Sequence, residues 1–172
     1  MMISVVIEAL NAEFPLVQTL AALVPAAAEG FVREVIVADA GSVDGTRLVA
    51  DAAGCVIVEG GRMKALAAAR SDWVLLVAPG VRLDPDWSRE AAAFLQRIQR
   101  NGETRRAATF RHALDEFGFR ARLAELCSRP LIRFRRPATL MGPRKALMAG
   151  EHLRATQLRA RAVAVRMMAS EA

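Results

Sequence analysis

The fold is decided by residues 34–46, which read Glu34-Val35-Ile36-Val37-Ala38-Asp39-Ala40-Gly41-Ser42-Val43-Asp44-Gly45-Thr46. The apolar run at 34–38 is typical of a strand buried on both faces. The glycine, serine and aspartate residues that follow are typical of a turn. Residues 47–53 have helical apolar spacing, so this stretch predicts a strand, a turn and a helix in succession.

The same unit repeats on both sides of this stretch. Apolar and β-branched runs predict strands at 3–7, 56–58 and 73–77, and helical spacing predicts helices at 14–28 and 63–70. Single helices between consecutive strands imply right-handed crossovers. We therefore expect an α/β fold, with a mainly parallel sheet and helices on both faces.

The second part of the chain has a weaker pattern. Asp84 and Pro85 predict the N-cap and first position of a helix that runs to about residue 100, where Asn101-Gly102 ends it. We further expect a strand at 107–111 and helices at 114–128 and 151–161. Because no repeat or linker is visible, residues 1–172 are expected to form one domain.

Length and composition exclude several classes of protein. The 172 residues are 53% hydrophobic, including 34 alanines, which is enough for one folded core and too apolar for a disordered chain. No apolar run approaches the ~20 residues that span a bilayer, and the N-terminus does not resemble a signal peptide, so we expect a cytoplasmic protein. Cys55 and Cys127 stand alone, which favours buried thiols over a disulfide or zinc site.

Charge is distributed unevenly along the chain. Residues 1–100 carry 9 basic and 12 acidic side chains, whereas residues 101–172 carry 15 basic and 6 acidic ones. Such a basic half indicates a surface for phosphates, nucleic acid or anionic lipid, although biased codon usage explains a chain rich in alanine and arginine equally well. Nucleic acid is the least favoured partner, because the chain has no tyrosine and no recognisable RNA-binding string.

Ligands of parallel α/β sheets bind beside the carboxyl ends of the strands. The loop after the first strand, Glu8-Ala9-Leu10-Asn11, has no glycine, which excludes the dinucleotide fingerprint, and the P-loop pattern is absent as well. After the second strand, Asp39 can accept a hydrogen bond from a base or a ribose hydroxyl. Gly41 allows close backbone approach, and Ser42 or Asp44 can cap the next helix. A well-capped turn accounts for the same residues without any ligand.

The order of these strings resembles family 2 glycosyltransferases of the GT-A fold, over residues 2 to about 95. The matching strings are Ile3-Ser4-Val5-Val6-Ile7 with Asn11, Asp39 with Gly41-Ser42-Val43-Asp44-Gly45-Thr46, Asp72-Trp73-Val74-Leu75-Leu76, and Leu83-Asp84-Pro85-Asp86-Trp87. The resemblance implies a GT-A domain shortened at its C-terminal end. Residues 1–100 would form the nucleotide-binding half and residues 101–172 a basic acceptor-side half.

The resemblance also implies a site for a UDP- or GDP-linked sugar, which is transferred to an acceptor with inversion. The residues that it places at the nucleotide are Asn11, Asp39, Gly41, Ser42, Asp44 and Arg62. The family holds Mg²⁺ or Mn²⁺ with a D-x-D motif at the end of the fourth strand, but this chain has Ala78-Pro79-Gly80 there. Neither alanine nor glycine has a side chain that ligates a metal.

Other residues are candidates for the missing chemistry. Asp84 and Asp86 are alternative metal ligands, although a helix start explains them better. Glu151, the only acid between 137 and 152, is the candidate base that deprotonates the acceptor. Basic side chains that can stabilise the diphosphate in place of a metal are Arg62, Lys64, Arg144 and Lys145.

Two functions remain open from the sequence. The first is a family 2-like glycosyltransferase with weak or lost activity. The alternative is a non-catalytic scaffold whose Arg-rich half binds a partner, an anionic membrane surface or a lipid-linked acceptor, with peripheral association at the membrane. An apolar face left uncovered by the shortened C-terminal part is a candidate homodimer interface.

Overall fold

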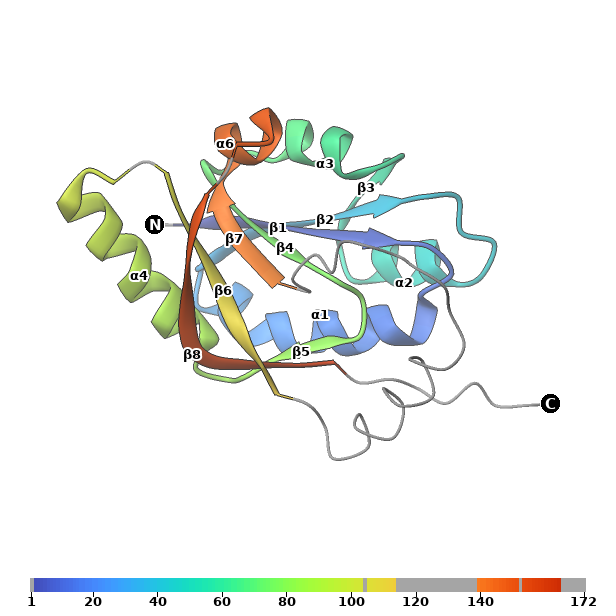
Figure 1. Ribbon diagram of the computed structural model, residues 1–172. Coiled ribbons are helices and arrows are strands. Elements are labelled where there is room, and N and C mark those ends of the chain that lie inside the picture. The colour runs from blue at the N-terminus through green and yellow to red at the C-terminus, as the bar shows by residue number, and fades with distance from the viewer. Residues whose placement is uncertain (1, 104, 114–138, 152, 165–172) are drawn as a thin grey trace, which may run out of the picture.

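The computed structural model describes residues 2–103, 105–113, 139–151 and 153–164 (Figure 1). Its elements follow in chain order as β1 (Ile3–Ala9), α1 (Glu13–Ala28), β2 (Val32–Asp39), α2 (Thr46–Ala52), β3 (Val56–Glu59), α3 (Arg62–Ala68), β4 (Trp73–Val77), β5 (Val81–Leu83), α4 (Trp87–Asn101), β6 (Arg106–Ala113), β7 (Thr139–Pro143), α6 (Arg144–Ala149) and β8 (Arg154–Ala164). The strands and helices predicted within residues 3–77 are all confirmed.

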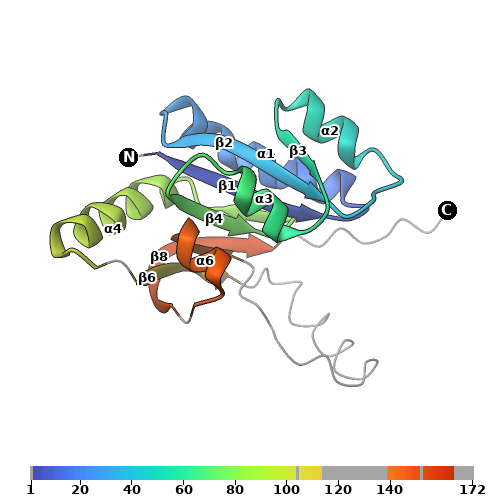
Figure 2. The ribbon, with the colours of Figure 1, turned by 90° about the horizontal axis from the view of Figure 1, so that it is seen from above.

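One sheet of eight strands runs in the order β3-β2-β1-β4-β7-β6-β8-β5. The first four strands in this order are mutually parallel, and β6 and β8 run in the same direction as they do. Only β5 and β7 run the other way. Helices α1 and α2 cover one face of the sheet, and α3 and α6 cover the other (Figures 1 and 2). The predicted α/β architecture with a mainly parallel sheet is therefore confirmed.

Alternate residues of the central strands face the two helical layers. On β1, Val5 and Ile7 belong to the apolar cluster that includes Leu16 of α1. Val6 lies in the opposite cluster with Leu66 of α3. Each of these side chains is almost fully buried, which contributes roughly 1.5–3 kcal/mol apiece to folding. The core thus fixes which face of the sheet each helical layer covers.

The start of α4 differs from the prediction. The helix begins at Trp87 with Asp86 as its N-cap, not at Asp84-Pro85, so the predicted start is wrong by two residues. Residues 81–83 form β5, which pairs with β8 and keeps the chain extended up to Leu83. The backbone N–H of Trp87 then donates to the Asp84 carbonyl at 3.0 Å, forming a turn before the helix. The predicted end is confirmed, since Gly102 caps the helix in the left-handed region at φ 65°.

The predicted helix at 151–161 is wrong, because residues 154–164 form the long strand β8. Alanine, arginine and leucine favour helices, but β8 pairs with β6 and with β5 along its length. This pairing satisfies the strand's backbone groups and outweighs the local preference. Strands β5 and β7 have no counterpart in the sequence prediction. The predicted helix at 114–128 and Cys127 lie outside the described residues.

Two further expectations concern the cysteine and the membrane. Cys55 is a free thiol but only half-buried, and burial raises its pKa to about 11. Within the described ranges, no helix has both the length and the apolar character that crossing a bilayer requires.

Candidate functional site

The loops that follow β1, β2, β3 and β4 meet at one edge of the sheet, which we call the carboxyl edge. A cavity of about 540 Å³ opens at this edge beside β2 and β3. Its lining consists of Asp39, Ala40, Gly41, Arg47, Glu59, Gly60 and Gly61. The cavity thus lies where the sequence predicted a ligand, after the second strand.

Asp39 provides the most unusual group in this cavity. It is the last residue of β2 and only 2% exposed. Its Oδ1 accepts a hydrogen bond from the Ser42 N–H at 3.1 Å, whereas its Oδ2 is buried and accepts none from the described residues. Buried polar atoms normally have partners, and leaving one unsatisfied costs about 1–3 kcal/mol. An N–H or O–H group entering the cavity would satisfy this oxygen.

Arg47 is the cation closest to the Asp39 carboxylate. Its Nη1 lies 3.8 Å from Asp39 Oδ2, beyond hydrogen-bond distance, and 2.9 Å from Glu59 Oε1. Half of the Arg47 side chain is exposed, and Glu59 is more exposed still. Arg47 therefore offsets part of the charge of Asp39 without using its hydrogen-bonding capacity.

Asn11 and Ser42 join the loops after β1 and β2. The Ser42 Oγ accepts from the Asn11 N–H at 3.0 Å, and the Asn11 Oδ1 accepts from the Val43 N–H at 2.9 Å. Asn11 adopts a left-handed backbone conformation at φ 48°, which asparagine tolerates better than most residues. These side chains set the shape of the edge, and Ser42 does not cap α2.

Asp44 and Thr46 make a second connection between the same loops. The Asp44 Oδ2 accepts from the Glu13 N–H at 3.2 Å, and its Oδ1 accepts from the Thr46 N–H at 3.0 Å, in the first turn of α2. The Thr46 hydroxyl donates to Asp44 and accepts from the buried Ala12 N–H at 2.8 Å. The hydrogen bond from this hydroxyl is the largest of the effects that lower the pKa of Asp44. The N-cap of α2 is Gly45 and has no side-chain cap hydrogen bond, so the predicted cap at Asp44 is wrong; Asp44 supports the start of α2 from the residue before the N-cap.

Arg62 stands at the carboxyl edge in an ion pair that the sequence did not predict. Its Nη2 pairs with Oε2 of Glu8 on β1, and its backbone N–H donates to Glu8 Oε1 at 3.3 Å. Glu8 is the residue before the last residue of β1, and Arg62 begins α3, so this ion pair joins the end of β1 to the loop after β3.

The end of β4 does not fit a metal site of the D-x-D type. Ala78, Pro79 and Gly80 offer no side-chain ligand, and the Ala78 carbonyl already accepts from the Val81 N–H at 3.2 Å. Among the described residues, no group of three or more histidine, cysteine or acidic side chains could hold a metal ion. The side chains that the structure describes at the end of β4 therefore do not match the carboxylate ligands that Mg²⁺ or Mn²⁺ prefers.

Asp84 and Asp86 lie at the opposite edge of the sheet, formed by the amino ends of the parallel strands, which we call the amino edge. Trp87 packs against Phe31, the residue before β2, with ring centroids 5.7 Å apart. Asp86 pairs with Arg89 at 3.1 Å. Neither aspartate is brought to Asp39.

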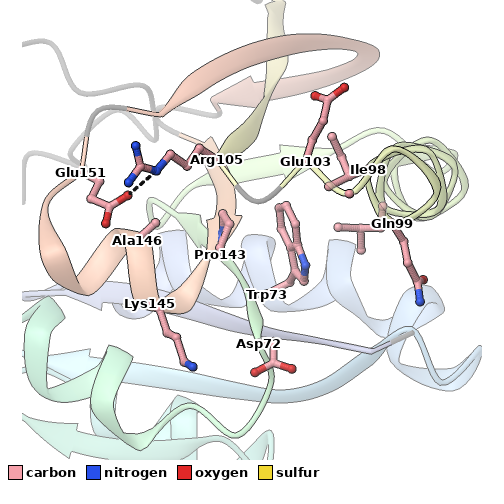
Figure 3. A pocket seen from close by; sticks show the side chains of 12 residues that line it. Asp72, Trp73, Ile98, Gln99, Glu103, Arg105, Pro143, Lys145, Ala146 and Glu151 are labelled. Atoms are coloured by element: carbon pink, nitrogen blue, oxygen red, sulfur yellow. Dashed lines mark ion pairs between the residues drawn. The ribbon is translucent and has the colours of Figure 1, made fainter.

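The amino edge also contains a larger cavity of about 630 Å³ (Figure 3). Residues lining it are Asp72, Trp73, Leu95, Ile98, Gln99, Gly102, Glu103, Arg105, Pro143, Lys145, Ala146 and Glu151. Glu151 pairs there with Arg105, with 3.5 Å between Oε2 and Nε. The Arg144 N–H donates to the Asp72 carbonyl at 2.7 Å, next to the start of β4. Glu151, Arg144 and Lys145 therefore lie at the end of β4 opposite to the carboxyl edge.

The structure thus divides the predicted site residues into two groups. It brings together Asn11, Asp39, Gly41, Ser42, Asp44 and Arg62 at the carboxyl edge, whereas Glu151, Asp84 and Asp86 lie at the amino edge. Sequence reasoning missed Arg47, Glu59 and Glu8. Arg47 carried a weak signal, because it directly follows the turn at 41–46.

Solved structures of glycosyltransferases are similar to this chain. Glucosyl-3-phosphoglycerate synthase from Mycobacterium tuberculosis, in complex with Mn²⁺, UDP and phosphoglyceric acid, is 25% identical with a TM-score of 0.54, over 85% of this chain and 57% of that one. Its complex with Mn²⁺, UDP-glucose and phosphoglyceric acid is 26% identical with a TM-score of 0.54, over 85% of this chain and 58% of that one. Its complex with Mg²⁺ and UDP is 20% identical with a TM-score of 0.59, over 97% of this chain and 72% of that one.

These similarities confirm the predicted resemblance to GT-A glycosyltransferases and the GT-A fold. The chain spans only 57% of the length of the first of these structures. Neither a protein-family model nor a curated protein sequence matches this chain.

Proposed function

We propose that this GT-A chain binds the nucleoside part of a nucleotide sugar at its carboxyl edge and belongs functionally with the family 2 glycosyltransferases. The observation that carries the proposal is the buried Oδ2 of Asp39, which has no hydrogen-bond partner within the part of the chain that the structure describes. Asp39 lines a cavity together with Gly41, Gly60 and Gly61, whose lack of side chains leaves room for a flat ring. Similar structures were solved with UDP or UDP-glucose, which favours uridine over other nucleosides.

The chemistry of a carboxylate restricts the base that it recognises. An ionised carboxylate only accepts hydrogen bonds, so it pairs with a ring N–H and repels a ring nitrogen that carries a lone pair. Uracil and guanine have such an N–H, whereas cytosine has an acceptor at the corresponding position. We therefore expect uridine and guanosine nucleotides to compete for the cavity and CMP to bind poorly.

Isothermal titration calorimetry with uridine, UDP, GDP and CMP tests this proposal on the full chain. Asp39→Asn keeps the oxygen that accepts from Ser42 and replaces Oδ2 by a donor. The substitution should weaken the binding of uridine and of UDP about tenfold or more, because the amide N–H of the asparagine would face the ring N–H of uracil. Asp51→Asn is the matched control, since Asp51 is exposed on α2 away from the cavity. Absence of UDP and GDP binding at millimolar concentration, or unchanged affinity in Asp39→Asn, would contradict the proposal.

Sugar transfer itself is the second part of the proposal, and one observation favours a non-catalytic alternative. The end of β4 lacks carboxylates, and Glu151, the candidate base, lies at the amino edge. A chain of this kind would bind the nucleotide sugar and turn it over slowly or not at all. Release of UDP from UDP-glucose decides between the two: release that Asp39→Asn abolishes supports transfer chemistry, and no release above the rate without protein supports a binding scaffold.

A further inference from the structure

We infer that Arg62 and Lys64 form a fixed cationic site for the diphosphate, so that nucleotide binding requires no divalent cation. This inference rests on the proposed nucleotide site and concerns the neighbouring part of the same edge. It starts from the mismatch between the end of β4 and a metal site. A diphosphate needs a counter-charge, and guanidinium and ammonium groups supply one without a metal.

The ion pair of Arg62 stands directly beside the position of the missing metal motif. Strand β1 lies next to β4, and Ile7 is opposite Val77, the last residue of β4. Glu8 therefore follows at the level of Ala78, where the D-x-D pattern would begin. In place of a carboxylate on β4 that holds a metal ion, a carboxylate on β1 holds a guanidinium.

Glu8 fixes the orientation of Arg62 without using all of its donors. The carboxylate of Glu8 accepts hydrogen bonds from Nη2 and from the backbone N–H of Arg62. The side chain of Arg62 keeps 28% of its surface exposed, and among the described residues its buried Nε has no hydrogen-bond partner. A planar guanidinium with unused N–H groups can donate to phosphate oxygens, and a preformed ion pair lowers the entropy lost on binding.

Lys64 places a second cation at the rim of the cavity that contains Asp39. A Cβ built on Gly60, which lines this cavity at φ +119°, would lie 3.1 Å from Cδ and 3.5 Å from Nζ of Lys64. The lysine chain thus lies against the glycine turn between Asp39 and Arg62. No ion pair involves Lys64 within the described ranges, so its charge is available to an anion.

The structure also separates these two cations from the other basic candidates. Arg144 and Lys145 lie at the amino edge with Asp72 and Trp73, too far along β4 to reach a nucleotide bound at Asp39. Of the four basic residues named from the sequence, only Arg62 and Lys64 are therefore assigned to the diphosphate.

Calorimetric titration with uridine, UDP and inorganic pyrophosphate tests the inference, each in EDTA and in Mn²⁺. In EDTA the wild type should bind UDP about tenfold more tightly than uridine, and Mn²⁺ should leave this preference unchanged. Arg62→Gln and Lys64→Gln should each reduce the preference for UDP over uridine and leave the affinity for uridine unchanged. Lys64 is exposed, so its substitution leaves the fold intact even if Arg62→Gln destabilises it.

Arg70→Gln is the matched control, because Arg70 is an exposed arginine paired with Glu34 at the amino edge and its removal changes the net charge equally. The inference is overturned if UDP binds more tightly than uridine only with Mn²⁺, or if Lys64→Gln and Arg62→Gln keep the full preference. Pyrophosphate separates this inference from the nucleoside proposal. Pyrophosphate binding that depends on Arg62, without uridine binding, would sustain the cationic site and refute the nucleoside site.

Discussion

The two edges of the sheet contain cavities of opposite character. At the amino edge the cavity is the larger, about 630 Å³ against about 540 Å³, and it is built around apolar side chains of the core such as Trp73 and Ile98. At the carboxyl edge the cavity is bounded by glycine turns and contains a buried carboxylate oxygen without a partner.

Buried polar atoms explain why the larger cavity is the weaker candidate. Its charged rim residues Glu151 and Glu103 are paired with Arg105 and Arg106, and Lys145 has no ion pair within the described ranges, as is also true of Lys64. Among the described residues, no side chain that lines the larger cavity has a buried polar atom without a hydrogen-bond partner, whereas Asp39 at the carboxyl edge has one in Oδ2. A buried polar atom without a partner, not volume, therefore indicates where a polar ligand binds.

Replacing Trp73 by alanine should have the largest effect on stability. Trp73 is 7% exposed and packs edge-on against Phe94 with ring centroids 6.1 Å apart, so its loss should cost about 3–5 kcal/mol of unfolding free energy. Urea denaturation measures this cost, and Val56→Ala on the exposed edge strand β3 is the control. At temperatures where the variant is folded, uridine affinity should be that of the wild type. Lost nucleotide binding in a folded Trp73→Ala protein would assign the ligand to the amino edge.

Replacing Thr46 by valine should have an intermediate effect, at the carboxyl edge. It leaves the buried Ala12 N–H without its acceptor, which should cost about 1–3 kcal/mol. In Thr46→Val, the Ala12 amide should exchange its hydrogen faster than in the wild type. Urea denaturation should show a lower free energy of unfolding. Thr46→Ser, which keeps the hydroxyl, should recover most of the loss. An equal loss in Thr46→Ser would show that packing of the methyl group, and not the hydrogen bond, joins the two loops.

The smallest effect is the acid dependence of Asp44. Hydrogen bonds from Thr46 lower its pKa in the folded state, so the carboxylate stabilises the fold fully above its unfolded pKa of about 3.9. This contribution disappears as the pH falls through the lower folded value. The free energy of unfolding, measured by urea denaturation between pH 5 and 2.5, should therefore fall less steeply with pH in Asp44→Asn than in the wild type or in Asp51→Asn. If the unfolding free energy of all three proteins falls equally steeply with pH, Asp44 does not contribute to the interactions that stabilise the carboxyl edge.

Much of the first half of the fold could be predicted, because its strands are apolar runs separated by recognisable turns. Strand β4, five buried residues at 73–77, was predicted with its bounds unchanged. The nucleotide-side residues could be named for a related reason: strand ends of a parallel sheet share one edge, so Asn11 and Asp39 had to be neighbours. Arg47 was missed, since its position after the turn at 41–46 is only a weak signal and a single sequence does not show that its side chain lies near Asp39.

In the second half of the chain, prediction from the helix and strand preferences of single residues failed, because pairing between strands far apart in sequence decides the structure there. Residues 154–164 are rich in helix-favouring residues and still form β8, because β6 and β5 offer backbone partners on both sides. Glu151 was selected by elimination within a short window, and only the reversal of the chain at β7 placed it at the amino edge.

The sequence by itself determined the α/β class, the order of the parallel strands' loops and the absence of carboxylates at the end of β4, because these depend on residue type and local periodicity. The tertiary structure alone decided that Glu8 holds Arg62, that Asp39 keeps an oxygen unpaired within the described residues, and that Glu151, Asp84 and Asp86 stand at the amino edge. The contact of Glu8 with Arg62 joins residues 54 positions apart, and such contacts are fixed by packing and strand register rather than by any local pattern.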